Sequence, residues 1–199
     1  MSISSISPLN PDLSETSVDQ PMFFVVSTRK LIVMCIFTFG FYWMFCLYRS
    51  WALYRRVSGE RVLPLVRAFF GILFLYSLLS RVDRQVRLSG RRYEWSPFWL
   101  VCVLILLTVP AVWAHWFIDL APMPILGLLV TMDVARFWVL ARMQQAMNFC
   151  VGDPEGKSNA RLSPLNWAWM AVGIVVWTVI VSVFVVLLVA LVLGVPVGG

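Results

Sequence analysis

Residues 167–193 read WAWMAVGIVVWTVIVSVFVVLLVALVL and contain no charged side chain. An α-helix rises 1.5 Å per residue, so about 20 apolar residues are enough to cross the roughly 30 Å of hydrocarbon in a bilayer. This segment is longer than that, and it therefore has room to tilt or to emerge from the bilayer. The pattern predicts a membrane-spanning helix.

The composition of the whole chain agrees with this prediction. Hydrophobic residues make up 60% of its 199 residues and charged residues 13%, whereas soluble domains have roughly 45–50% and about 25%. A chain with so little charge cannot cover a water-exposed surface. The composition therefore excludes a soluble globular protein and a disordered one.

Three other apolar blocks are long enough for a spanning helix: residues 98–118 easily, and residues 31–48 and 123–140 narrowly. Together with the last block, they predict an all-α integral membrane helical bundle over residues 23–199, with about four spanning helices. The first 22 residues are polar and rich in Ser and Pro, and they lack the basic and apolar regions of a signal peptide. We expect residues 1–22 to form a disordered tail.

A fifth apolar block, residues 62–79, is interrupted by Arg67. Only residues 68–79 are free of charge, which is the length typical of a re-entrant or interfacial segment. Arginine-rich linkers, residues 49–61 and 80–97, lie on both sides of the block. A crossing would place one linker outside, against the positive-inside tendency. We therefore expect this block to be a half-inserted helix that keeps both linkers inside.

The first block allows two paths for the chain. If residues 31–48 cross the membrane, the N-terminus lies outside. Alternatively, Thr38, Phe39 and Gly40 break the helix into a hairpin that returns to the inner side. The sequence is consistent with both.

The positive charge is expected to face lipid. Lys and Arg number 16 against 10 Asp and Glu, for a net charge of +6. The arginines flank apolar blocks, where the anionic cytoplasmic face of a membrane attracts them, so we expect anionic headgroups and not nucleic acid as the partner. The predicted anionic-lipid contacts are Arg67, Arg81, Arg84, Arg87, Arg91 and Arg92.

Arg67 has two interpretations within this group. Its guanidinium fork suits a lipid phosphate or an anionic substrate. Alternatively, the side chain snorkels, so that the guanidinium reaches the interface while its stem covers apolar surface. We favour snorkelling.

Asp133 and Arg136 are predicted to form an intramembrane ion pair. Asp133 falls near the middle of the 123–140 block, where a lone charge costs about 2.5–3.5 kcal/mol on insertion scales. Residues three apart share a helix face. The pair either docks this helix against its neighbours, which we favour, or serves a proton or ion pathway. Thr178 and Ser182 are candidate hydrogen-bond partners on the last helix.

Nothing in the sequence indicates a catalytic set or a cofactor. The four cysteines form no CxxC motif, and the single histidine has no set of metal ligands around it. Residues 152–158, GDPEGKS, lack the glycine spacing of a phosphate-binding loop. No GxSxG or HExxH motif is present. We expect no cofactor and no metal, and we lean away from an enzyme.

Several blocks resemble a family of uncharacterised multi-pass membrane proteins. The resemblance lies in TFGFYWMFCLYRSW (residues 38–51), LVRAFF (65–70), YSL (76–78), NAR (159–161) and NW (166–167). It implies a small multi-pass protein of the inner, cytoplasmic membrane of Gram-negative bacteria. It carries over no catalytic residue.

The expected function is that of an accessory or scaffold component of the membrane, which associates with other membrane proteins or with itself. Two alternatives are kept. One is a small transporter or channel that uses Asp133 and Arg136. The other is an enzyme that modifies lipid headgroups and grips them with Arg67 and the arginines of residues 81–92.

Overall fold

The computed structural model describes residues 21–114 and 122–193, and within them the regular secondary structure is helical. The all-α prediction is confirmed for this part of the chain. Residues 1–20 of the predicted tail lie outside the described residues. The elements are α1 (Thr28–Phe37), α2 (Phe41–Ser58), α3 (Pro64–Phe69), α4 (Gly71–Leu88), α5 (Pro97–Ala114), α6 (Pro122–Val151), a short 3₁₀ helix η3 (Lys157–Asn159) and α7 (Pro164–Leu193).

The two longest helices, α6 and α7, have 30 residues each. Each contains a segment long and apolar enough to cross a membrane, Pro124–Val151 in α6 and Pro164–Val186 in α7. Helix α5 is apolar but shorter, and the end of the predicted 98–118 block lies outside the described residues. Four spanning helices were expected, whereas two helices of the described chain meet this criterion.

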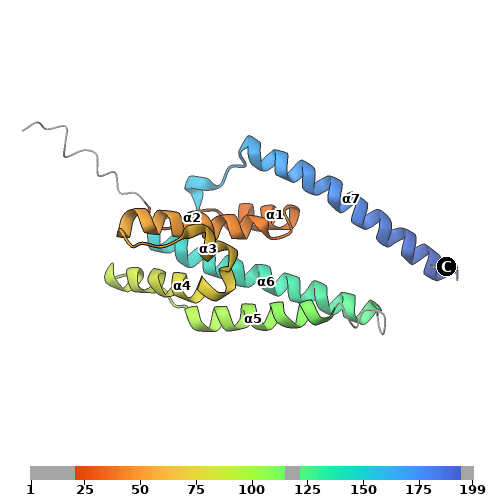
Figure 1. Cartoon of the computed structure of the whole chain (residues 1–199), viewed down its shortest axis with the longest axis horizontal. Helices are drawn as coiled ribbons and strands as arrows, with labels where there is room; N and C mark the ends of the chain where they lie inside the picture. The colour runs from red at the N-terminus through yellow and green to blue at the C-terminus, as the bar shows by residue number, and fades with distance from the viewer. Residues whose placement is uncertain (1–20, 115–121, 194–199) are drawn as a thin grey trace, which may run out of the picture.

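The first apolar block is not one helix, because it bends at residues 38–40. Phe39 and Gly40 both have a positive φ, 52° and 87°, which ends α1 and starts α2. The Thr38 hydroxyl donates to the Met34 carbonyl oxygen and accepts from the Tyr42 amide, at 2.7 and 3.0 Å. Helices α1 and α2 consequently run antiparallel (Figure 1). The break at residues 38–40 that the second of the two paths requires is therefore present.

The second apolar block also bends, at Phe70, between α3 and α4. A Cβ on Gly71 would lie 2.8 Å from Leu47 Cδ1, so the absence of a side chain lets this turn approach α2. Helix α4 continues past the predicted end of the block to Leu88 as an amphipathic helix. Its buried face is formed by Leu75, Leu78, Leu79, Val82 and Val86.

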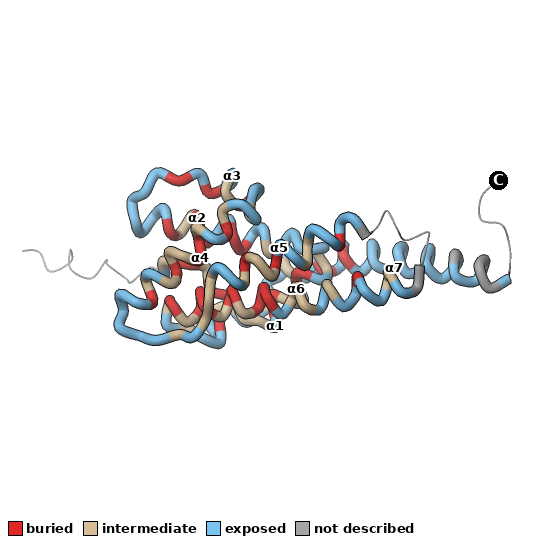
Figure 2. The backbone as a smooth tube through the Cα atoms, turned by 90° about the horizontal axis from the view of Figure 1, so that it is seen from below, coloured by how far each residue is buried: buried red, intermediate tan, exposed pale blue. Residues whose placement is uncertain are grey.

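Both hairpin turns point along the long axis in the direction in which α5 and α7 run (Figure 1). Helices α5, α6 and α7 extend beyond the turns, and α7 lies apart from α5 and α6, on the α1 side of the bundle (Figure 1). Burial is concentrated where all the helices overlap, while the far portions of α5, α6 and α7 are largely exposed (Figure 2). The packed core lies at this overlapping end, around Phe23, Trp51, Leu79, Met143 and Met147.

Candidate functional site

The predicted ion pair of α6 is formed. Arg136 Nη2 donates to Asp133 Oδ1 across one helical turn. The Asp133 side chain is 52% exposed, whereas that of Arg136 is 27% exposed. The carboxylate is therefore neutralised from one side only and is open on the other.

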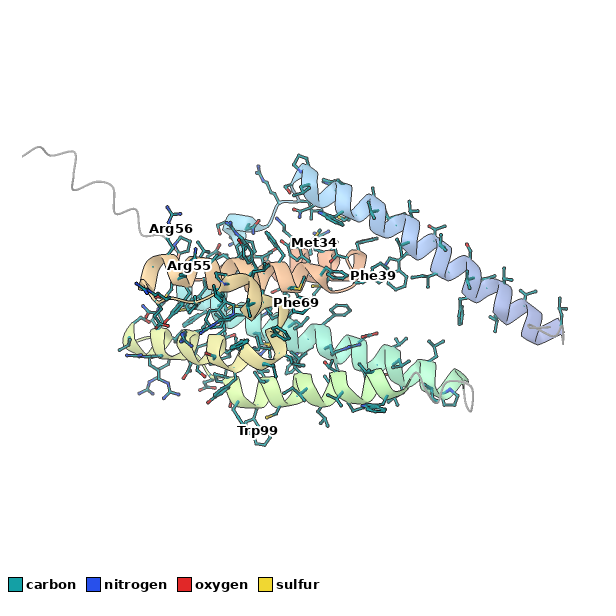
Figure 3. All side chains as sticks on the ribbon, in the orientation of Figure 1. Met34, Phe39, Arg55, Arg56, Phe69 and Trp99 are labelled. Atoms are coloured by element: carbon teal, nitrogen blue, oxygen red, sulfur yellow. The ribbon has the colours of Figure 1, made fainter. Side chains whose placement is uncertain are left out.

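Both residues of this pair line a groove of about 690 Å³. It lies between the two hairpins and helices α5, α6 and α7, and we call it the hairpin groove. Phe39 and Phe69 stand at the hairpin turns that border it (Figure 3). Its other polar lining includes Thr108 of α5, whose hydroxyl donates to the Leu104 carbonyl of its own helix.

The predicted hydrogen-bond partners on α7 do not reach the ion pair. Thr178 donates to the Ile174 carbonyl oxygen of its own helix at 2.8 Å, and Ser182 is exposed. Helix α7 instead contributes Trp177, which lines the hairpin groove and stacks on Phe39 with ring centroids 5.2 Å apart. The cause is that α7 packs against α1 and lies apart from α6 (Figure 1).

Four of the six predicted lipid-contacting arginines, Arg84, Arg87, Arg91 and Arg92, are exposed in the last part of α4 or just after it. Arg87 pairs with Asp83 at 2.8 Å. Arg91 donates to the Cys150 carbonyl oxygen at 2.7 Å, which ties the end of α4 to α6. Arg55 and Arg56 lie at the same end of the molecule (Figure 3). We call the exposed arginines at this end the basic collar; they are Arg55, Arg56, Arg61, Arg84, Arg87, Arg91 and Arg92.

Arg67 does not snorkel away from the bundle. Its guanidinium carbon lies 4.4 Å from the ring centroid of Trp51 and 5.4 Å from that of Phe74. Its Nη1 atom is buried, and among residues 21–114 and 122–193 it finds no hydrogen-bond partner. The side chain is folded inward because a desolvated guanidinium is attracted to the faces of aromatic rings.

Arg81 also lies over the Trp51 ring, but both of its Nη atoms make hydrogen bonds. Its guanidinium lies 5.4 Å from the Trp51 centroid and 5.1 Å from that of Tyr54. Nη1 donates to the carbonyl and hydroxyl oxygens of Ser77, and Nη2 donates to Glu60 Oε2 at 3.1 Å. We call Trp51, Tyr54, Glu60, Arg67 and Arg81 the arginine–tryptophan cluster.

Glu60 completes this cluster with both carboxylate oxygens. Oε1 accepts from the Tyr54 hydroxyl at 2.6 Å, while Oε2 accepts from Arg81. These two hydrogen bonds, that of Tyr54 first, lower the pKa of Glu60 from its ordinary value. The carboxylate is thereby held ionised between the end of α2 and α4.

A second polar cluster was missed by sequence reasoning. Residues 23–26 form an extended strap that precedes α1, with Phe23 and Val26 fully buried. Asn148 of α6 donates to the Val26 carbonyl at 2.9 Å and accepts from the Val26 amide at 3.3 Å. Gln144, one turn earlier, donates to the Phe24 carbonyl at 2.8 Å. The four-residue spacing of these two amides is the signal that could have revealed it.

The loop before α7 closes over the same strap. Asn159 donates to the Val25 carbonyl at 2.9 Å, and Lys30 Nζ donates to Asn159 Oδ1 and to the Arg161 carbonyl, both at 2.7 Å. A Cβ on Gly156 would lie 2.5 Å from the backbone of the strap. The GDPEGKS loop therefore has a packing role here, and its glycine permits close approach to the backbone.

Comparisons with protein-family models, curated proteins and solved structures find no match. Within the described parts of the chain, no group of three His, Cys, Asp or Glu side chains is placed to hold a metal ion. Any statement about function consequently depends on the geometry of the clusters above.

Proposed function

We propose that this chain is an accessory or scaffold protein embedded in a membrane, which acts by helix association and not by catalysis. The observation that supports the proposal is the polarity of the molecule along its long axis. The exposed arginines of the basic collar lie at one end, where α2 and α4 finish (Figure 3). The opposite portion is covered by exposed apolar side chains.

The apolar portion begins at the hairpin turns. Phe39, Phe69 and Phe70 are exposed there by 47%, 71% and 49%. Continuous apolar surface of this kind is stable against lipid but not against water. We infer that both hairpins are half-inserted, while α5, α6 and α7 cross the membrane.

In this arrangement every arginine of the basic collar follows the positive-inside tendency. With both hairpins returning, the arginines after α2 and after α4 remain on one side. The proposed location is the inner membrane of a Gram-negative bacterium, with the collar and the strap on the cytoplasmic side.

Helix α7 is the element proposed to bind partners. It packs against α1 through its first half, where Met170 and Gly173 are buried. Beyond Gly173 the described side chains are exposed, including Val179 and Val183. A long helix with an open apolar surface is suited to packing against another membrane helix.

Site-specific photocrosslinking in intact membranes tests this proposal. A photoreactive residue at Val179 or Val183 is expected to give a discrete protein adduct, either with a second copy or with another membrane protein. Met170 provides the matched position, because it is on the same helix but buried, and it should give no adduct. Adducts with lipid alone at Val179 and Val183 would contradict the proposal.

A second candidate function is an ion or proton pathway, favoured by the half-exposed Asp133 in the hairpin groove. A carboxylate open to a groove between helices is the arrangement expected where protons or ions move. Asp133→Asn should then abolish an ion- or proton-dependent flux in proteoliposomes while leaving the protein folded. If flux is the same with and without the substitution, this candidate is rejected.

A further inference from the structure

We infer that Arg67 is a binding site for the phosphate group of an anionic phospholipid, with Trp51 holding its guanidinium in place. The inference rests on the proposed membrane location. It assigns a specific ligand to one arginine, which distinguishes this site from the diffuse attraction of the basic collar.

The first step is the unsatisfied hydrogen-bonding capacity of Arg67. Its Nη1 atom is buried and makes no hydrogen bond to any residue that the structure describes. A buried N–H of a charged group that lacks an acceptor is costly. The ring faces of Trp51 and Phe74 stabilise the positive charge but offer no lone pair to the N–H groups. The geometry therefore calls for an acceptor from outside the described chain.

The second step is that the neighbouring carboxylate, Glu60, already accepts hydrogen bonds from other residues. Glu60 gives one oxygen to Tyr54 and the other to Arg81. Arg81 in turn is satisfied by Glu60 and by Ser77. Of the two guanidinium groups over Trp51, Arg67 is thus the one whose charge is not matched by a carboxylate in a salt bridge.

The third step concerns the surroundings of Arg67. On the same short helix, Leu65 and Phe69 are each 71% exposed, and Leu63 just before it is 66% exposed. These side chains form an apolar surface suited to acyl chains. A planar guanidinium beside such a surface fits a ligand with a phosphate and a lipid tail, because its fork binds two phosphate oxygens at once. A phospholipid meets both requirements.

The test measures lipid binding to the purified full chain in a mild detergent by native mass spectrometry. Phosphatidylglycerol is the probe, and diacylglycerol, which has no phosphate, is the comparison lipid. Arg67→Gln is expected to weaken phosphatidylglycerol binding at least about tenfold, the factor for loss of one charge-assisted hydrogen bond. Diacylglycerol binding should not change. Arg67→Lys keeps the charge but loses the fork, and it should bind with intermediate affinity.

Arg161→Gln is the matched control, since Arg161 is exposed and is not one of the predicted lipid contacts. It removes the same charge and is expected to change phosphatidylglycerol binding by less than about twofold at physiological salt. Equal losses in Arg67→Gln and Arg161→Gln would show that net charge alone attracts the lipid, and would overturn the inference. Unchanged binding in Arg67→Gln would overturn it as well.

Two further arms identify the source of the phosphate and guard against misfolding. Inorganic phosphate that binds Arg67 as tightly as the lipid does would overturn the lipid assignment in favour of a soluble ligand. Glu60→Gln removes a negative charge near the site while keeping Arg67, and it should strengthen phosphatidylglycerol binding; weaker binding in this variant contradicts the inference. Membrane extraction and α7 crosslinking of Arg67→Gln report on the proposed function separately, and they should match the unsubstituted chain.

Discussion

At the scale of single residues, Asn148 illustrates how one polar side chain orders a neighbouring segment. Its carboxamide donates to the carbonyl of Val26 and accepts from the amide of the same residue, as a backbone partner in a β-ladder would. Asn148 and Gln144 are fully buried. These two side chains thereby pair with backbone groups of the strap that would otherwise be buried without partners.

Asn148→Ala is expected to destabilise the folded protein by about 1–3 kcal/mol for each of the two Val26 groups that it leaves unpaired. Asn148→Asp should also be destabilising, because a carboxylate cannot donate to the Val26 carbonyl and its charge is buried. Thermal unfolding in detergent measures both effects. Gln145→Ala is the control and should change the melting temperature little, because it removes an amide from a half-buried position of the same helix.

Glu60 gives the chain a pH dependence at its polar end. Its pKa is lowered in the folded protein by the Tyr54 hydroxyl and by Arg81. A carboxyl group whose pKa is lowered by folding stabilises the protein at neutral pH, and this stabilisation is lost as the pH falls through the folded-state pKa.

We therefore expect Glu60→Gln to lower the melting temperature at neutral pH and to have little effect in acid, below the ordinary titration range of glutamate. Unfolding curves of the two chains over this pH range provide the measurement. A constant difference between them at all pH values would show that Glu60 acts through packing and not through its charge.

At the scale of helices, the contact between α7 and α1 depends on Gly173. A Cβ at this position would lie 2.2 Å from the Phe37 carbonyl oxygen at the end of α1. One turn further along, Trp177 Nε1 donates to the Ile36 carbonyl at 3.0 Å. Carbonyl groups at the end of a helix lack intrahelical partners. Helix α7 thus fits closely against α1 and gives the Ile36 carbonyl a second donor besides the Phe39 amide.

Gly173→Ala is expected to push α7 away from α1 and to lower stability by about 1–3 kcal/mol, as overpacking typically does. Gly127→Ala in α6 is the matched control, because nothing lies within 4 Å of its added Cβ. It should be neutral or stabilising by up to about 1 kcal/mol. Unfolding of both variants in detergent tests the contact, and equal effects of the two substitutions would rule it out.

The two hairpins were only partly predictable from the sequence. The Thr38-Phe39-Gly40 bend was one of two paths, because glycine permits a turn without requiring one. A glycine, Gly71, also follows the break at Phe70 but was not predicted to end a helix; only Arg67 indicated that residues 62–79 do not form an ordinary spanning helix. In the structure Phe39 stacks on Trp177 of α7 and Gly71 lies against Leu47 of α2, and neither contact is visible in the sequence.

At the scale of the whole molecule, the separation of charged and apolar surface leads to a specific membrane topology. The linkers after α2 and after α4 lie at the same end of the molecule, whereas the start of α6 lies at the opposite end (Figure 1). If the long axis of the molecule crosses a membrane, the two linkers lie in the same aqueous compartment.

Cysteine labelling with a membrane-impermeant maleimide tests this topology. Cysteines replacing Ser58 and Ser89 are expected to react from the cytoplasmic side, and one replacing Pro124 from the opposite side. A cysteine replacing Phe70 should react from neither, because the proposed arrangement puts this hairpin turn within lipid. The parent chain serves as the background control, since three of its four cysteines are buried. Labelling of positions 58 and 89 from opposite sides would refute the two half-inserted hairpins.

The sequence by itself determined the helical class, the apolar character of the last block and the Asp133–Arg136 pair, because hydropathy, helix length and three-residue spacing are local properties of the chain. Only the tertiary structure decided that Arg67 stacks on Trp51, that Asn148 holds the strap and that Thr178 stays away from Asp133. Each of these depends on which helices pack side by side. Such long-range contacts are made by residues far apart in the chain, and a local pattern such as the four-residue spacing of Gln144 and Asn148 does not say which segment these side chains meet.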